Sequence, residues 1–252
     1  MSRQKSKQDA NQKNFIGTSG YYYPGWIGKF YPEGMKSSEF LNYYQDYFDT
    51  VELNSTFYHM PKKTTMKTMK RKLKPDFVVS VKMNRTITHL KRLKNVENEL
   101  RMFFDSVSEL VTNLGVILVQ LPPSLKLNLE ILNNFLTLLP NQFKYAIEFR
   151  HKSWLDESVF TLLRDYNVAF VISHGDDYPF LRRETANFSY IRLHGPDELY
   201  ASLYSESELN EWAEYIKSIN EKGVEAFVYF NNDFYGYAIV NATSLKNLLS
   251  ML

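Results

Sequence analysis

The sequence contains no cysteine among its 252 residues. Disulfide bridges and thiolate chemistry are therefore excluded, which suits a reducing compartment. Long apolar runs are also missing, since none approaches the roughly 18 residues of a membrane-spanning helix. Residues 1–14 are polar and lack the apolar stretch of a signal peptide, so we expect a disordered leader there. These absences predict a cytoplasmic protein without a membrane partner.

Three motifs of common enzyme classes are absent as well. The sequence has no GxGxxG fingerprint, no phosphate-binding P-loop and no Gly-x-Ser-x-Gly nucleophile elbow. Nucleotide hydrolysis through a Walker motif and α/β-hydrolase chemistry are therefore disfavoured. A cofactor is not identified by any motif.

Acidic residues are scarce in the first half of the chain. Residues 1–126 contain 20 Lys and Arg against 11 Asp and Glu, a net +9, and residues 127–252 contain 10 against 17, a net −7. Residues 62–94 alone hold 12 basic residues and one acid, Asp76. Such a block predicts weak, salt-dependent binding of nucleic acid. The alternative is a solvated helix face followed by a loop.

Eight apolar, β-branched runs each stop abruptly at polar or ionisable residues. Helical periodicity fills most of the intervals between them, which is typical of a (β/α)₈ TIM-like barrel of about 250 residues. We expect one barrel domain over residues 15–252, with an irregular connection at 174–187. The expected strands span residues 15–20, 50–53, 77–82, 116–120, 145–148, 168–172, 189–193 and 226–230.

The polar strand ends locate the expected site, because catalytic residues of TIM barrels lie at the carboxyl ends of the strands. Side chains two apart share a face of a strand, so Glu148 and Arg150 should point together. Glu148 is the candidate general base or acid, and the alternative is an internal salt bridge that closes the barrel top. Lys82 could form a Schiff base, bind phosphate or, most simply, act as counter-ion to Glu148.

Histidines follow four of the strands, which indicates acid–base or metal chemistry. His194 and His151 are the candidates for proton transfer. No tight metal-ligand spacing occurs, and residues 174–177 (His-Gly-Asp-Asp) form the best local candidate. Gly-Asp is also common turn chemistry, so the presence of a metal is left open.

Substrate binding is assigned to the remaining polar and aromatic residues of the expected rim. Arginines would hold anionic groups, amides would orient substrate, and loop aromatics could stack on a sugar or base or pack the loops onto the barrel. The candidates are Glu52, Asn54, Tyr58, His89, Gln120, Arg150, Arg192, Tyr229, Asn231, Asn232 and Asp233.

Several stretches, in order along nearly the whole chain, resemble the YecE-like family, also known as domain of unknown function 72. They are residues 17–20 with Trp26, 30–32, 50–58, 88–89, 120–123, 148–154, 192–195, 229–233, 236–238 and 241–242. The resemblance implies a TIM-barrel-like fold and no established reaction. Two departures are visible: Tyr21 stands where many members have tryptophan, and Ser173-His174 stands where many have an aspartate.

The leading functional hypothesis is an enzyme that acts on a polar, phosphorylated or sugar-like small molecule or nucleotide. The alternatives are a nucleic-acid-binding protein using residues 62–94, which could include a metal-dependent nuclease, and a non-catalytic binding scaffold. A deep pocket lined by Glu148 and Lys82 would favour small-molecule chemistry.

Overall fold

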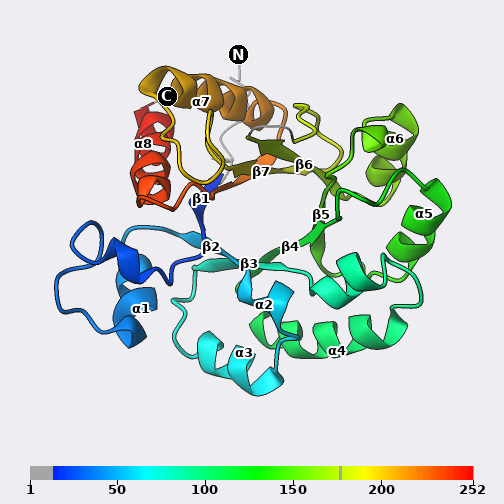
Figure 1. Ribbon diagram of the computed structural model, residues 1–252, viewed down its shortest axis with the longest axis horizontal. Coiled ribbons are helices and arrows are strands. Elements are labelled where there is room, and N and C mark those ends of the chain that lie inside the picture. Colours follow the sequence, from blue (N-terminus) through cyan, green and yellow to red (C-terminus); the bar gives the residue numbers. More distant parts are fainter. Residues whose placement is uncertain (1–13, 176–177, 252) are drawn as a thin grey trace, which may run out of the picture.

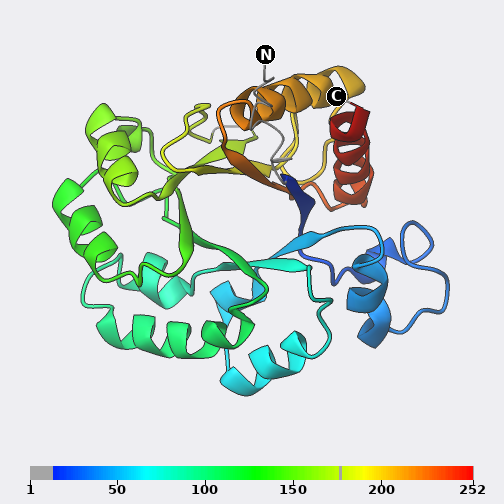
Figure 2. The ribbon, with the colours of Figure 1, turned by 180° about the vertical axis from the view of Figure 1, so that it is seen from behind.

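Eight parallel strands form a closed barrel in sequence order in the computed structural model, which describes residues 14–175 and 178–251. Figure 1 shows the strands as a ring with the helices outside it, and Figure 2 shows the same ring from behind. The (β/α)₈ fold predicted from the sequence is therefore confirmed. The strands are β1 (Asn14–Ser19), β2 (Thr50–Leu53), β3 (Val78–Lys82), β4 (Leu114–Gln120), β5 (Lys144–Glu148), β6 (Ala169–His174), β7 (Phe188–Leu193) and β8 (Glu225–Phe230).

Some of the helices begin at capping side chains. Asp156 accepts a hydrogen bond from Ser158 N, and Ser205 and Glu208 form a capping box. The α-helices are α1 (Phe40–Tyr44), α2 (Ser55–Tyr58), α3 (Lys63–Lys70), α4 (Glu97–Val107), α5 (Leu129–Thr137), α6 (Glu157–Asp165), α7 (Glu206–Asn220) and α8 (Tyr237–Met251). Five short turns complete them: η1 (Pro24–Trp26), η2 (Ser37–Glu39), η3 (Thr86–Leu90), η4 (Ser108–Leu110) and η5 (Lys152–Trp154).

The connection between β6 and β7 is irregular, as predicted. Residues 178–187 form neither helix nor strand. They are tied to the barrel by Thr185, whose hydroxyl accepts from Phe170 N at 2.7 Å and donates to Val168 O at 2.7 Å. The expected leader lies outside the described residues except for Asn14, which already belongs to β1.

Among residues 14–175 and 178–251, no helix is long and apolar enough to cross a membrane. The cytoplasmic location stays a prediction.

The apolar core has two layers. One lies between the barrel and the helices, and the other fills the barrel interior with Phe15, Val116, Leu118, Phe188, Phe227 and their neighbours. Phe15 stacks on Phe227 with ring centroids 4.7 Å apart. At the amino-terminal end of the strands, Lys144 and Glu225 form an ion pair, and Lys144 Nζ lies 5.2 Å from the Phe227 ring centre. Because this end is filled, a ligand can enter the barrel only at the carboxyl ends of the strands.

Candidate active site

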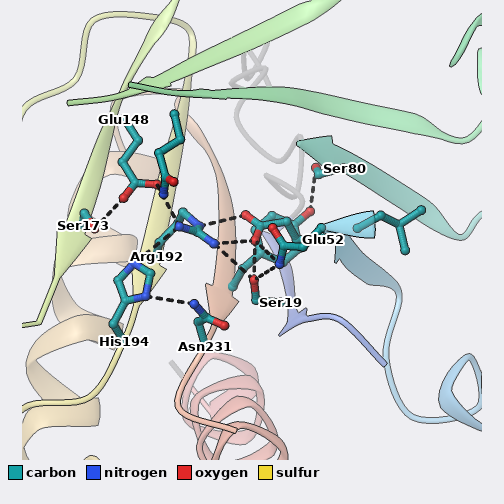
Figure 3. Close-up of polar contacts among 12 residues, drawn as sticks. Ser19, Glu52, Ser80, Glu148, Ser173, Arg192, His194 and Asn231 are labelled. Atoms are coloured by element: carbon teal, nitrogen blue, oxygen red, sulfur yellow. Dashed lines mark hydrogen bonds and ion pairs between the residues drawn. The ribbon is translucent and has the colours of Figure 1, made fainter. Parts of the chain in front are cut away.

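One arginine on the barrel axis organises the carboxyl ends of the strands. Arg192, the fifth residue of β7, is 1% exposed and lies between two fully buried glutamates, Glu52 on β2 and Glu148 on β5 (Figure 3). Its Nε and Nη2 donate to Glu52 at 2.9 and 2.7 Å, and its Nη1 donates to Glu148 at 2.8 Å. The guanidinium therefore joins opposite sides of the barrel through three charge-assisted hydrogen bonds.

Both glutamates are held as anions despite their burial. Burial opposes ionisation of Glu52, but Arg192 and the hydroxyls of Ser19 and Tyr190 outweigh it and hold the pKa of Glu52 below its usual range. Burial likewise opposes ionisation of Glu148, and the nearby Arg150 and Arg192 hold its pKa far below its usual range. Glu148 also accepts a hydrogen bond from Gln120 Nε2 at 3.0 Å. These carboxylates are thus poor proton acceptors in the free protein.

A cavity of about 1050 Å³ opens above this network. Its size matches sites that enclose a small-molecule ligand. The wall draws on the carboxyl ends of all eight strands and the loops after them. It is lined by Tyr23, Asn54, Phe57, Tyr58, Lys82, Arg85, His89, Gln120, Leu121, Pro123, Arg150, Tyr178, Arg192, Tyr200, Asn231 and Asp233.

Lys82, the last residue of β3, is a buried cation of this wall. Among the described residues it forms no ion pair with a carboxylate, unlike Arg150 and Arg192. Its side chain is folded over Phe57, with Nζ 4.2 Å from the ring centre. Among the described residues, its Nζ forms no hydrogen bond and no ion pair, which differs from the simple counter-ion role towards Glu148. Burial, reinforced by the charge of Arg192, lowers the pKa of Lys82 to about 8, although Glu148 and Glu52 oppose the shift. A sizeable fraction of the amine is therefore neutral near pH 7–8.

His89 lies beside Lys82 on the turn that follows β3. The Phe57 ring contacts both residues, and its centroid is 4.9 Å from that of His89. Thr88 Oγ1 is 2.8 Å from His89 Nδ1, which leaves Nε2 for the cavity. Burial and the charges of Lys82 and Arg85 lower the pKa of His89 to about 4. The imidazole is therefore neutral at physiological pH and can relay a proton without adding charge.

Arg150 forms the opposite wall. Its guanidinium pairs with Glu148 and stacks on Tyr178, with Cζ 3.5 Å from the ring centre. The Tyr178 hydroxyl is 2.8 Å from that of Tyr200. Both rings meet His194 edge-on, and His194 Nδ1 is 3.0 Å from Asn231 Nδ2. Burial and the charge of Arg192 hold the pKa of His194 well below its usual range, so this imidazole is neutral.

The structure brings most of the predicted site residues to this mouth. Nine of the fifteen line the cavity: Asn54, Tyr58, Lys82, His89, Gln120, Arg150, Arg192, Asn231 and Asp233. Glu52, Glu148 and His194 lie buried among the groups beneath and beside it. Their roles in catalysis or binding stay predictions.

Three predicted residues lie away from the cavity. His151 accepts a hydrogen bond from Ser153 N at 3.1 Å and caps the turn η5. Tyr229 lies in the barrel interior, where its hydroxyl is 2.7 Å from Thr50 Oγ1 and 2.8 Å from Ser80 Oγ. Asn232 is buried and donates to Asn241 Oδ1 at 2.9 Å. In this geometry all three side chains form hydrogen bonds within the barrel and its loops, and none of them lines the cavity.

Three residues that line the cavity were not among the candidates predicted from the sequence: Arg85, Tyr178 and Tyr200. Arg85 is exposed on the wall and, among the described residues, has no ion-pair or hydrogen-bond partner for its side chain. It lies three residues after Lys82, so the end of β3 could have indicated it. Tyr178 and Tyr200 lie in loops without regular structure and carry no periodic signal.

No metal centre is visible within residues 14–175 and 178–251, where no three His, Asp or Glu side chains gather in a way that could hold an ion. His174, from the candidate sequence at residues 174–177, has its Nδ1 2.9 Å from the Tyr204 hydroxyl. Asp176 and Asp177 lie outside the described residues.

The basic block at residues 62–94 divides into two parts. On α3 and the loop after it, Lys63 pairs with Asp105 at 3.1 Å and Lys74 with Asp46 at 2.6 Å. Lys82 and Arg85 instead face the cavity. The block is therefore partly an ion-paired helix surface and partly a wall of the site. Nucleic-acid binding through these residues stays a prediction.

Fold and site together define the class of protein: a TIM-like barrel whose carboxyl-terminal mouth holds a cation-rich cavity over a buried Glu–Arg–Glu network. The family model described as "Protein of unknown function DUF72" matches residues 15–252. The chain belongs to this family, as its sequence motifs indicated.

Relatives in bacteria share the sequence to different extents. UPF0759 protein YecE of Escherichia coli K12 is 30% identical over 138 residues, which cover 54% of this chain and 48% of that protein. The match therefore spans about half the length of YecE. UPF0759 protein YunF of Bacillus subtilis is 22% identical over 271 residues, covering 94% of this chain and 95% of that protein. The crystal structure of a DUF72 family protein from Thermotoga maritima is 33% identical, with a TM-score of 0.83, and covers 94% of this chain and 98% of that one.

Proposed function

We propose that this protein is an enzyme that acts on a small anionic, phosphorylated or sugar-like molecule in the cavity at the barrel mouth. The observation that carries the proposal is the pair Lys82 and Arg85, two cations in the cavity wall that have no acidic partner among the described residues. Lys82 is buried, and a buried cation without a partner costs free energy unless a ligand supplies the opposite charge. The exposed Arg85 adds a second positive charge to the same wall.

The charge balance of the wall supports an anionic ligand. The charges of Arg150 and Arg192 are neutralised by Glu148 and Glu52. Of the described residues that line the cavity, only Asp233 is acidic. Lys82 and Arg85 therefore leave an excess of positive charge. An ammonium and a guanidinium are the groups that bind phosphate or carboxylate oxygens most strongly.

Neutral polar groups complete the lining. The amides of Asn54, Gln120 and Asn231 can exchange hydrogen bonds with hydroxyl groups, and Tyr58 and Tyr178 offer ring faces to a sugar or base. A ligand with both an anionic group and several hydroxyls would use both parts of the wall. A phosphorylated sugar or a nucleotide has this composition.

Proton transfer fits Lys82 better than Glu148. General acid–base catalysis is most efficient when the pKa of the group lies near the working pH, and the pKa of Lys82 is about 8. The pKa of Glu148 is far below that range. In this proposal Glu148 holds Arg150 and Arg192 in place, and the catalytic role inferred for it from the sequence moves to Lys82.

Arg85→Ala is expected to weaken binding of phosphorylated sugars and nucleotides by about tenfold or more, because one charge-assisted hydrogen bond contributes roughly 1.5–3 kcal/mol. Binding is measured by titration calorimetry and by the shift in thermal unfolding, with ribose 5-phosphate, AMP and inorganic phosphate as probes and ribose as the uncharged comparison.

Arg71→Ala is the matched control, because Arg71 is an exposed arginine at the end of α3 that does not line the cavity. It should bind each probe as the wild type does. Equal affinities for Arg85→Ala and the wild type, or no preference of the wild type for ribose 5-phosphate over ribose, would show that the cavity is not an anion site.

A further inference from the structure

We infer that Lys82 is a nucleophile that forms an imine with a carbonyl group of the ligand, so that the site takes phosphorylated aldehydes or ketones. This inference rests on the proposed function and names the substrate class and the bond that forms. Its basis is the position of the buried Lys82 amine in the cavity wall, without an ion-paired carboxylate among the described residues and with an exposed cation, Arg85, three residues away.

The Lys82 amine is buried and, among the described residues, forms no ion pair that would keep it protonated. Removal from water favours the neutral amine, whose lone pair is then available. Desolvated amines are the ones that react with carbonyl compounds near neutral pH. The titratable and charged groups near the amine come from four strands or the turns after them. They are Glu52, Arg85, His89, Glu148, Arg150 and Arg192.

Two anchors would place the carbonyl carbon next to the amine. In this proposal the exposed Arg85 binds the phosphate, and the amides of Asn54 and Gln120, which line the same cavity, bind hydroxyl groups. A ligand held by both would present its carbonyl group within the cavity that Lys82 also lines. Holding the reactants together in this way replaces a bimolecular encounter.

The chemical step needs no oxidant or reductant. The lone pair of Lys82 Nζ attacks the carbonyl carbon, and the π electrons of the C=O bond move to oxygen, which takes a proton. The nitrogen loses a proton, the hydroxyl group is protonated, and water leaves as the C=N bond forms. Amine, carbonyl compound and one proton thus give an iminium ion and water. His89 Nε2, which is not engaged by Thr88, can carry the proton between nitrogen and oxygen.

Reductive trapping tests the inference directly. The intact protein is incubated at pH 8 with glyceraldehyde 3-phosphate, or with glyceraldehyde, in the presence of sodium cyanoborohydride, which reduces the iminium ion to a stable secondary amine. Peptide mass spectrometry then locates the adduct. Lys82 should be labelled at least about tenfold faster than the exposed Lys36, because burial lowers the pKa of Lys82 to about 8.

Two variants separate this inference from the proposed function. Lys82→Arg keeps the cation and should still bind inorganic phosphate while losing the adduct. Arg85→Ala should slow trapping of glyceraldehyde 3-phosphate about tenfold more than it slows trapping of glyceraldehyde. If a variant fails to fold, competition by inorganic phosphate against trapping of the wild type gives the same distinction.

The outcomes are distinct. Equal labelling of Lys82 and Lys36 overturns the imine inference, and the anion site still stands if phosphorylated probes bind. Selective labelling of Lys82 by both aldehydes, with no effect of phosphate or of Arg85→Ala, supports the nucleophile and overturns the anion site. Selective labelling that phosphate suppresses supports both.

Discussion

Arg192→Met is expected to lower the free energy of unfolding by about 3–5 kcal/mol, because removing one partner of a buried ion pair leaves an uncompensated charge. Glu52 loses its cation, since its remaining partners are the hydroxyls of Ser19 and Tyr190 and the Asn54 amide. Glu148 keeps Arg150 and is affected less. Urea denaturation at pH 7, followed by circular dichroism, gives the change.

The double variant Arg192→Met/Glu52→Gln is the control for this interpretation. The Glu52→Gln change removes the carboxylate charge that Arg192→Met leaves without a cation. The double variant should therefore be more stable than Arg192→Met alone. If the two variants are equally unstable, the loss comes from the packing of the large arginine side chain. A loss below about 1 kcal/mol in Arg192→Met would mean that the network does not hold the barrel mouth together.

The strands and the end of the barrel that holds the site could be predicted from the sequence. β-branched runs ending in charged residues mark the strand ends, and alternation along each strand indicates which side chains point inward. That reasoning brought Lys82, Arg150 and Arg192 to one cavity, where the structure places them.

Alternation becomes unreliable beyond the last strand residue. Asn84 lies two residues after Lys82 and would share its face in a continuing strand, but its amide turns away and donates to Thr56 O and Phe57 O on α2. His151 follows β5 by three residues and is rotated into a cap, because Phe149 stacks on Trp154 and fixes the turn. Side-chain direction in such turns depends on tertiary packing. It leaves no periodic pattern in the sequence from which it could be predicted.

The ion pairs between charged residues on distant strands could not be predicted from the sequence either. Residues 52 and 192 are 140 positions apart, and the sequence offers no signal that Arg192 takes both glutamates and leaves Lys82 without one. The counter-ion role inferred for Lys82 was the simplest assumption about three neighbouring charges. In the structure the ion pairs of Glu148 go to Arg150 and Arg192, and Lys82 forms none among the described residues.

Lys82→Met is expected to stabilise the protein at pH 7 by about 1–3 kcal/mol, because the wild type pays for burying a cation that has no ion pair. The pKa of Lys82 falls from its usual 10.5 to about 8 on folding. Between these values the unfolded chain binds the proton and the folded chain does not, so wild-type stability rises with pH across that window. Below pH 8 the full cost is present.

The gain from Lys82→Met should therefore shrink as the pH is raised from 8 to 10.5, and urea melts at pH 7, 8, 9 and 10 measure it. Lys36→Met, at an exposed site, is the matched control and should change stability by less than about 0.5 kcal/mol at every pH. A loss of stability in Lys82→Met at pH 7 would make Lys82 a structural residue. A gain of stability in Lys82→Met, accompanied by loss of anion binding and of imine trapping, would mean that Lys82 destabilises the folded protein and is present for its chemical role.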